Sequence, residues 1–249
     1  VEIFNLGQDA HEKGDLRKAI ELYRKALTII PEFPEAEFQM AAALLALNEP
    51  AEAEKAFRRA AGLREDWSPP RAALGSLLVQ AGKFAEAETW LSSALELDET
   101  NTPAYVAMTD LRLKTKSSAG VLQELLAKIR FLTGKANPTA ALWVSRASLE
   151  RALGDMESAK KSISSALRID PANRAGIAER IEIGLAEKNF DGALEDAKGL
   201  VRVAPQSDDA KLLLARSLAA AGQIDEASEM LDALPAGMSA AAELDRKST

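Results

Sequence analysis

The feature that most constrains this chain is a sequence pattern that recurs at a nearly constant interval. One set of mostly small residues recurs at intervals of 34, 34, 34, 38, 34 and 34 residues along the chain. Its members are Ala19, Ala53, Ala87, Val121, Ala159, Ala193 and Ala227. A second set repeats these steps: Gly7, Ala41, Gly75, Thr109, Ala147, Ile181 and Ala215. Small residues at matched places let two helices approach closely. The interval therefore predicts repeated helical hairpins, which must stack because short helices are marginal alone.

The residues around these positions resemble the tetratricopeptide repeat, whose pattern runs from an aromatic residue through Leu-Gly and Ala-x3-Phe to a final proline. The first unit carries Leu6, Gly7, Gly14, Asp15, Ala19, Tyr23, Ala26 and Pro31 in the expected order. The fifth unit carries Trp143, Gly154, Asp155, Ala159, Ile163, Ala166 and Pro171. The resemblance implies an all-α fold, a right-handed superhelical solenoid of stacked antiparallel helix hairpins.

Seven units are expected in a single solenoid over residues 1–238, at 1–33, 34–67, 68–101, 102–139, 140–173, 174–207 and 208–238. The fourth departs most, because Val121 and Lys128 replace the usual alanines and four extra residues follow. We place this insertion near 133–138, and because four residues are about one helical turn, it could lengthen a helix without rotating its apolar face. Residues 239–249 are interpreted as a capping helix or a frayed tail. The chain starts inside its first helix, which suggests that it was cut from a longer protein.

Charge and composition exclude several kinds of partner and site. The net charge of −7 argues against nucleic acid, which is bound through Lys and Arg. No apolar run is long enough to cross a bilayer, so membrane insertion is not expected. The absence of cysteine excludes disulfides and thiolate chemistry. The compartment stays open between cytoplasm and export.

Chemistry-bearing residues are sparse. His11 is the only histidine, so any catalytic triad or histidine metal site would depend on it. No phosphate-binding glycine loop is present, and no cofactor is expected. Glu179 and Glu182 lie three residues apart and share a helix face, which a solvated surface explains better than an acid pair. Trp67 lies in a connection where the repeat does not require so large a side chain, and it is either a partner contact or a packing residue.

The resemblance implies a concave surface lined by the first helix of each hairpin. Its first row is mainly bulky and apolar: Phe4, Phe38, Ala72, Val106, Val144, Ala178 and Leu212. The next row is small or polar: Gln8, Ala42, Ser76, Asp110, Ser148, Glu182 and Arg216. A third row is mixed: His11, Leu45, Val79, Leu113, Arg151, Leu185 and Ala219. We expect the partner contacts at Phe4, Gln8, His11, Phe38, Val106, Asp110, Val144, Arg151, Glu182, Leu212 and Arg216. The alternative is that the apolar row is buried against its own hairpins.

Chaperone-binding members of the family clamp a terminal carboxylate with Lys, Asn and Arg. The matching places in the first three units hold Phe4, Gln8, Gln39, Pro69 and Ala73, so this clamp is missing there.

The sequence therefore predicts a non-catalytic scaffold that binds a peptide or helical segment of another protein in an apolar-lined groove. One alternative makes the chain the interaction arm of a larger multidomain enzyme, for example a transferase whose catalytic domain lies outside these residues. Self-association through the open end units or the convex face is a third possibility, which light scattering would detect.

Overall fold

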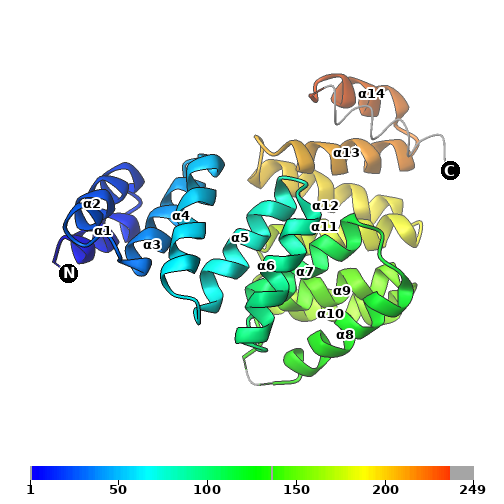
Figure 1. Cartoon of the computed structure of the whole chain (residues 1–249). Helices are drawn as coiled ribbons and strands as arrows, with labels where there is room; N and C mark the ends of the chain where they lie inside the picture. The colour runs from blue at the N-terminus through cyan, green and yellow to red at the C-terminus, as the bar shows by residue number, and fades with distance from the viewer. Residues whose placement is uncertain (1, 136, 236–249) are drawn as a thin grey trace. The chain divides into compact units, whose positions relative to one another are not determined.

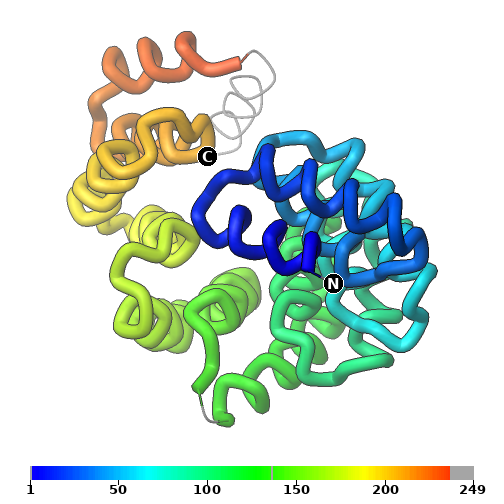
Figure 2. Tube along the Cα trace, turned by 90° about the vertical axis from the view of Figure 1, so that its left-hand side faces the viewer, coloured from blue at the N-terminus to red at the C-terminus, as the bar shows by residue number. Residues whose placement is uncertain are grey.

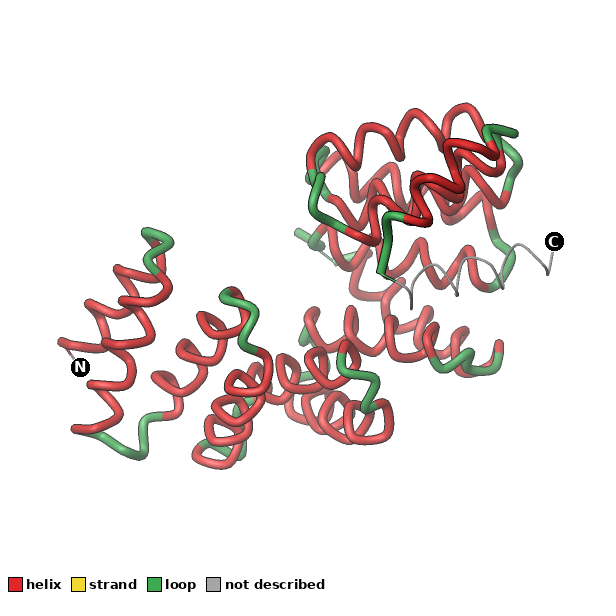
Figure 3. Tube along the Cα trace, turned by 90° about the horizontal axis from the view of Figure 1, so that it is seen from above, coloured by secondary structure: helices red, strands yellow, loops and turns green. Residues whose placement is uncertain are grey.

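A computed structural model of the chain describes residues 2–135 and 137–235, which form fourteen α-helices joined by short connections (Figure 1). The first helices of the hairpins are α1 (Glu2–Glu12), α3 (Pro34–Ala46), α5 (Ser68–Gln80), α7 (Thr102–Lys114), α9 (Ala140–Ala152), α11 (Arg174–Ala186) and α13 (Asp208–Ala220). The second helices are α2 (Leu16–Ile29), α4 (Pro50–Leu63), α6 (Phe84–Leu97), α8 (Ala119–Thr133), α10 (Met156–Ile169), α12 (Phe190–Val203) and α14 (Ile224–Asp232). Figure 3 shows only helices and loops over the described residues, so the predicted all-α helical-repeat solenoid is confirmed.

Each pair of helices is joined by a turn with one residue in the left-handed backbone region. These residues follow the repeat steps: Gly14, Asn48, Gly82, Lys116, Gly154, Lys188 and Gly222, with φ between 50° and 84°. Left-handed backbone ends a helix and is easiest for glycine and asparagine. The side chain that follows can cap the next helix, as Asp15 Oδ1 does by accepting from Lys18 N at 3.2 Å. Local sequence thus sets the start of each second helix.

The chain divides into two compact units, residues 1–117 and 118–249. In the first unit, α7 packs on both α5 and α6 and closes the series of hairpins that begins with α1 and α2. In the second unit, α8 packs on α9, and the hairpins α9–α10, α11–α12 and α13–α14 follow in order (Figure 2). The boundary falls inside the predicted fourth repeat. A single solenoid running unbroken over residues 1–238 stays a prediction.

The small residues of the repeat let the helices of a hairpin approach closely. A Cβ atom added at Gly7 would lie 2.7 Å from Tyr23 Cε1, and one at Gly75 would lie 2.6 Å from the Leu91 side chain. Tyr23 and Leu91 are fully buried. Burial raises the pKa of Tyr23 to about 12, with a further contribution from the charge of Glu12. The close approach of the two helices that these small residues predict is present in both hairpins.

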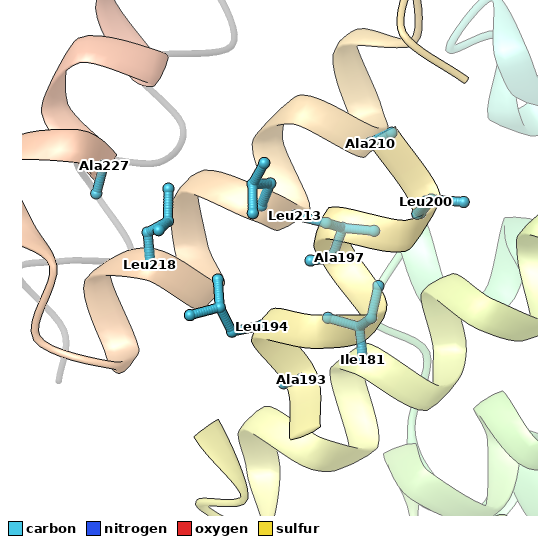
Figure 4. Close-up of a cluster of buried hydrophobic side chains, with 10 residues drawn as sticks. Ile181, Ala193, Leu194, Ala197, Leu200, Ala210, Leu213, Leu218 and Ala227 are labelled. Carbon is cyan, nitrogen blue, oxygen red and sulfur yellow. The ribbon is translucent and has the colours of Figure 1, made fainter. Parts of the chain in front are cut away.

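The core of the second unit continues between hairpins. Figure 4 shows buried side chains from α11, α12, α13 and α14 in one cluster. Its members are Ile181, Ala193, Leu194, Ala197, Leu200, Ala210, Leu213, Leu214, Leu218 and Ala227. Ile181 occupies the register position that is glycine or alanine in most other units, and it lies among Ala193 and Ala197 of the facing helix. Small residues on the partner helix therefore leave room for the larger side chain.

The fourth repeat differs from its prediction in two ways. Val121 is 36% exposed, whereas Leu122 is 7% exposed, so the buried register position is Leu122 and the assignment to Val121 is wrong by one residue. The four extra residues do not form one added helical turn. One lies in the turn before Ala119, one lengthens α8 to 15 residues, and the others extend the connection at 134–139. A single extra turn residue rotates the register of the following helix, which accounts for the shift.

The possible capping helix at 239–249 lies outside the described residues. None of the helices that the structure does describe is long and apolar enough to cross a membrane.

Candidate functional site

The first helices form one face of each unit, which we call the inner face. Contacts join α1 to α3, α5 to α7, α9 to α11 and α11 to α13. Between successive second helices within the described residues, no comparable packing occurs. In a curved stack, the elements that approach one another lie on the inside of the curve. The eleven predicted partner residues belong to first helices, six in the first unit and five in the second.

In the first unit, the aromatic residues of the predicted apolar row pack against their own hairpins. Phe4 is buried, with its ring 5.7 Å from Tyr23 and 4.8 Å from Phe33. Phe38 is half-buried, 5.7 Å from Phe57 and 5.1 Å from Trp67. Aromatic pairs at these separations are attractive beyond the area they bury. Phe4 therefore offers little open surface, and Phe38 offers one side.

Trp67 repeats the place of Phe33 one unit later, and the two aromatic pairs Phe4–Phe33 and Phe38–Trp67 are equivalent. The guanidinium carbon of Arg64 lies 4.6 Å from the Trp67 ring centroid, which is a cation–π contact. Trp67 thus has a structural role, although it remains half-exposed.

The remaining predicted residues of the first unit lie on its inner face without forming a cluster. His11 and Gln8 are half-buried on α1, and His11 Nδ1 is 3.5 Å from Tyr23 Oη. On α7, Val106 is half-buried, and Asp110 Oδ2 is 3.1 Å from Lys114 Nζ one turn later.

In the second unit, the predicted apolar row is half-exposed. Val144, Ala178 and Leu212 lie at equivalent positions of successive repeats, on α9, α11 and α13. Val144 packs at the edge of the cluster around Ala147, and Leu212 packs beside Ala215. Each of the three side chains packs on a core cluster of the unit and is also partly exposed.

A line of charged residues runs beside this apolar row, and we call it the ionic ladder: Arg151, Glu179, Glu182 and Arg216. Arg151 Nε donates to Glu179 Oε1 at 2.5 Å, which links α9 to α11. Arg216 donates to Glu182 from Nη1 at 2.5 Å and from Nη2 at 3.1 Å, which links α13 to α11. The structure therefore brings together three predicted site residues, Arg151, Glu182 and Arg216.

Glu179 completes the ladder, and its interpretation as a solvated surface residue is wrong. It is 7% exposed and also accepts from Ser148 Oγ at 2.8 Å. Burial disfavours the charged form of Arg151, but the hydrogen bond and charge of Glu179, with the charge of Glu182, outweigh it and raise the Arg151 pKa. The sequence signal for this pair was a Glu and an Arg at positions that face each other in adjacent first helices.

A second polar network was missed by the sequence analysis. Glu150 of α9 has no exposed surface, and its carboxylate accepts from Arg146 Nε at 2.9 Å, Arg130 Nη2 at 3.1 Å and Ser162 Oγ at 2.6 Å. Arg146 also donates to Thr133 Oγ1 at 3.1 Å. The network joins α8, α9 and α10 through one buried charge. Buried charges occur in proteins when they are paired in this way.

No group of three or more His, Asp or Glu side chains that could hold a metal occurs within residues 2–135 and 137–235.

The sequence relatives match parts of the chain. Human protein O-mannosyl-transferase TMTC2 is 31% identical over 101 residues, 39% of this chain and 12% of that protein. A STIP1 homolog from Dictyostelium discoideum is 28% identical over 139 residues, 53% of this chain and 25% of that protein. The chain thus spans a quarter or less of the length of these relatives.

Solved structures share the fold. The Cut9 and Hcn1 hetero-tetramer of the APC/C has a TM-score of 0.72 at 19% identity, over 87% of this chain and 42% of the other. A tetratricopeptide repeat protein from Parabacteroides merdae has a TM-score of 0.68 at 20% identity, over 87% and 83%.

Family models for the tetratricopeptide repeat match residues 10–77 and 184–243, and a second model of the same repeat matches residues 71–101 and 140–173. Together with the helical hairpins and their repeated register, these matches show that the chain belongs to the tetratricopeptide-repeat family.

Proposed function

We propose that this chain is a protein-interaction scaffold, without catalysis of its own, that holds a peptide or helical segment of a partner on an inner face. Tetratricopeptide repeats in general support a scaffold role. The observation that carries the finer proposal is the half-exposed row of Val144, Ala178 and Leu212 beside the ionic ladder. An amphipathic segment can place its apolar side on such a row and its polar side against the charges.

The test needs variants that change the inner face without disturbing a core. Phe38 is unsuitable because it packs between Phe57 and Trp67. Val144→Glu combined with Leu212→Glu changes two half-exposed positions of one unit. The control is Ile169→Glu, which places one glutamate at an exposed apolar position at the end of a second helix.

A photo-crosslinking residue at Ala178 would first capture the partner, and a purified partner segment would then be titrated by calorimetry. We expect the double variant to weaken binding by at least about tenfold, which is about 1.4 kcal/mol, with an unchanged circular dichroism spectrum. Ile169→Glu should bind like the unaltered chain. Equal binding by the double variant and the control would refute an inner-face site.

A second candidate function is the interaction arm of a longer enzyme. A partial match favours this candidate: 39% of this chain matches 12% of a protein named as an O-mannosyl-transferase, so repeats of this kind occur within a longer protein that carries an enzyme's name. Reading the complete gene would decide, since this candidate requires a catalytic domain in the same polypeptide. A full-length product made only of repeats would eliminate it.

A further inference from the structure

Successive second helices leave a groove above the first helix between them, on the side of the unit away from the inner face. The groove between α12 and α14 has a volume of about 490 Å3. It is lined by Lys198, Val201, Lys211, Leu214, Leu218, Glu226, Glu229, Met230 and Ala233. Its floor is apolar and its rim is charged. The volume is within the range of about 300 to 1,000 Å3 that is usual for binding pockets.

The equivalent position in the first unit, between α4 and α6, holds the chain's own tryptophan. The guanidinium carbons of Arg58 and Arg71 lie 5.9 Å and 5.6 Å from the centroid of the Trp90 ring. Arg58 Nη2 also lies 2.5 Å from Glu86 Oε1, an ion pair that spans α4 and α6. Two cations around an indole ring are favourable because the ring face is electrostatically negative. Here, the chain's own indole ring lies against both cations.

The α12–α14 groove of the second unit has two cations and an acidic residue at the same register positions, but it lacks the tryptophan ring. Lys198, Lys211, Glu226 and Met230 correspond in register to Arg58, Arg71, Glu86 and Trp90. Both cationic positions and the acidic position are kept, whereas the aromatic side chain is replaced by methionine. Lys211 Nζ is 3.4 Å from Asp208 and Lys198 Nζ is 3.7 Å from Glu195, both of them partly exposed pairs that contribute little. Both lysines are available to a ring.

We propose that the α12–α14 groove binds an aromatic side chain, best an indole, presented by a protein partner. The ring would lie over Met230 and the leucine floor, with the ammonium groups of Lys198 and Lys211 near its faces. Charge complementarity selects an aromatic side chain over an aliphatic one of similar size, since only the ring has a negative face. Thioether sulfur also contacts aromatic rings favourably. The chain's own residues 236–249 include no aromatic side chain, so they do not supply this ring.

The groove between α2 and α4 provides an internal comparison. It has a volume of about 380 Å3, and Met40 lies in its floor. Its counterpart of Lys211 is the acidic Glu37, whose carboxylate accepts from Arg59 at 2.7 Å and 2.9 Å. Two arginines, Arg24 and Arg59, line this groove, but Arg59 is held in a bidentate pair by Glu37. This groove should not take a ring in the same way.

Methionine methyl NMR on the full chain gives a direct test, because a ring over Met230 shifts its methyl resonance upfield. N-acetyl-tryptophanamide is the probe, and N-acetyl-leucinamide is the aliphatic comparison. We expect a saturable upfield shift at Met230 with the tryptophan compound, a several-fold weaker response to the leucine compound, and no matching shift at Met40. The Lys198→Gln and Lys211→Gln double variant, which removes both cations, should lose the preference for the ring.

Two reciprocal substitutions make the outcome sharper. Met230→Trp should fill the groove as Trp90 does and abolish probe binding, whereas Met230→Leu should retain it. Trp90→Met should open the equivalent groove of the first unit and create a second site for the probe. Equal responses to both compounds, or probe binding that Met230→Trp leaves unchanged, would overturn the proposal.

Other occupants of the groove give distinct results, and each contradicts the proposal. If residues 236–249 fill the groove, Met230 in the full chain will not respond to the probe. If a second copy of the chain fills it, the Met230 resonance will move with protein concentration in the absence of any probe.

Discussion

The buried carboxylate of Glu150 gives the most quantitative prediction, because one charge joins three helices. Glu150→Gln keeps the size of the side chain and removes its charge, so Arg130 and Arg146 lose their ionic partner. Breaking a fully buried pair costs about 3–5 kcal/mol. The side chains of Arg130 and Arg146 are 45% and 24% exposed and can recover water. We therefore expect a smaller loss than this range, about 2–3 kcal/mol.

The assay must report local stability, since an array of repeats does not unfold as one two-state body. Native-state hydrogen exchange of amides in α8, α9 and α10 should show an opening free energy lower by about 2–3 kcal/mol in Glu150→Gln. Amides in α13 and α14 serve as the internal control, because repeats stabilise mainly their direct neighbours. Their protection should be unchanged.

A second variant separates the charge from the shape of the site. Met40 and Leu44 occupy the register positions of Arg146 and Glu150 in the second repeat. The double change Arg146→Met and Glu150→Leu copies that apolar pair, while Arg130 can turn to Asp155, 3.7 Å away. Replacing a buried ion pair by apolar residues is often neutral or stabilising. A change in local stability of less than about 0.5 kcal/mol in Glu150→Gln, or an equal loss in the apolar variant, would contradict a stabilising role of the buried charge.

Two further predictions concern the first unit. Gly75→Ala should destabilise it by about 1–3 kcal/mol, because the new Cβ would lie 2.6 Å from a leucine side chain of α6. Gly62 lies in a helix, and a Cβ added there would have no neighbour within 4 Å, so Gly62→Ala should instead stabilise the unit by about 0.5–1 kcal/mol. Urea unfolding measures both variants, and equal effects of the two substitutions would show that the clash at Gly75 is irrelevant. The hydrogen bond from Arg58, followed by that from Lys83, lowers the pKa of Glu54. Since the folded pKa lies below the unfolded one, the stabilisation by Glu54 is present above the ordinary carboxyl pKa and is lost as pH falls through the folded value. The difference in melting temperature from Glu54→Gln should therefore shrink on acidification, and a difference that grew instead would contradict this sign.

The hairpin architecture could be predicted from sequence because it depends on local, repeated choices. A turn residue able to adopt left-handed backbone recurs with each repeat, as at Gly14 and Gly154. Small residues such as Gly75 recur opposite large ones such as Leu91. These features act within one hairpin and do not depend on distant parts of the chain. The helix pairs and the membership of the repeat family therefore followed from the pattern.

The fourth repeat shows where periodicity misleads. Counting from the preceding units placed Val121 in the core, but one extra turn residue after Lys116 moves that position to Leu122. A change of one residue rotates a helical side chain by about 100°, since a turn holds about 3.6 residues. The sequence contained the insertion, and only the structure shows how it is divided between turn, helix and connection.

The candidate site was predicted in part. The rows along the first helices were assigned by register, and the structure places Arg151, Glu182 and Arg216 in one ladder. The burial of Glu179 and the network around Glu150 were not foreseen. From sequence alone, a charged residue in a helix is assigned to the surface. Its burial can be recognised only when the neighbouring side chain that pairs with it is known.

The repeating unit, its turns and, outside the fourth repeat, the helix residues that face the partner helix follow from the sequence alone, because these features depend on contacts close along the chain. The burial of charges and the covering of apolar residues are visible only in the folded arrangement. Those outcomes depend on side chains that come from different repeats, such as Arg151 and Glu179. Trp90 and Met230 occupy equivalent register positions. Trp90 lies against two arginines of its own chain, whereas Met230 lines the groove between α12 and α14.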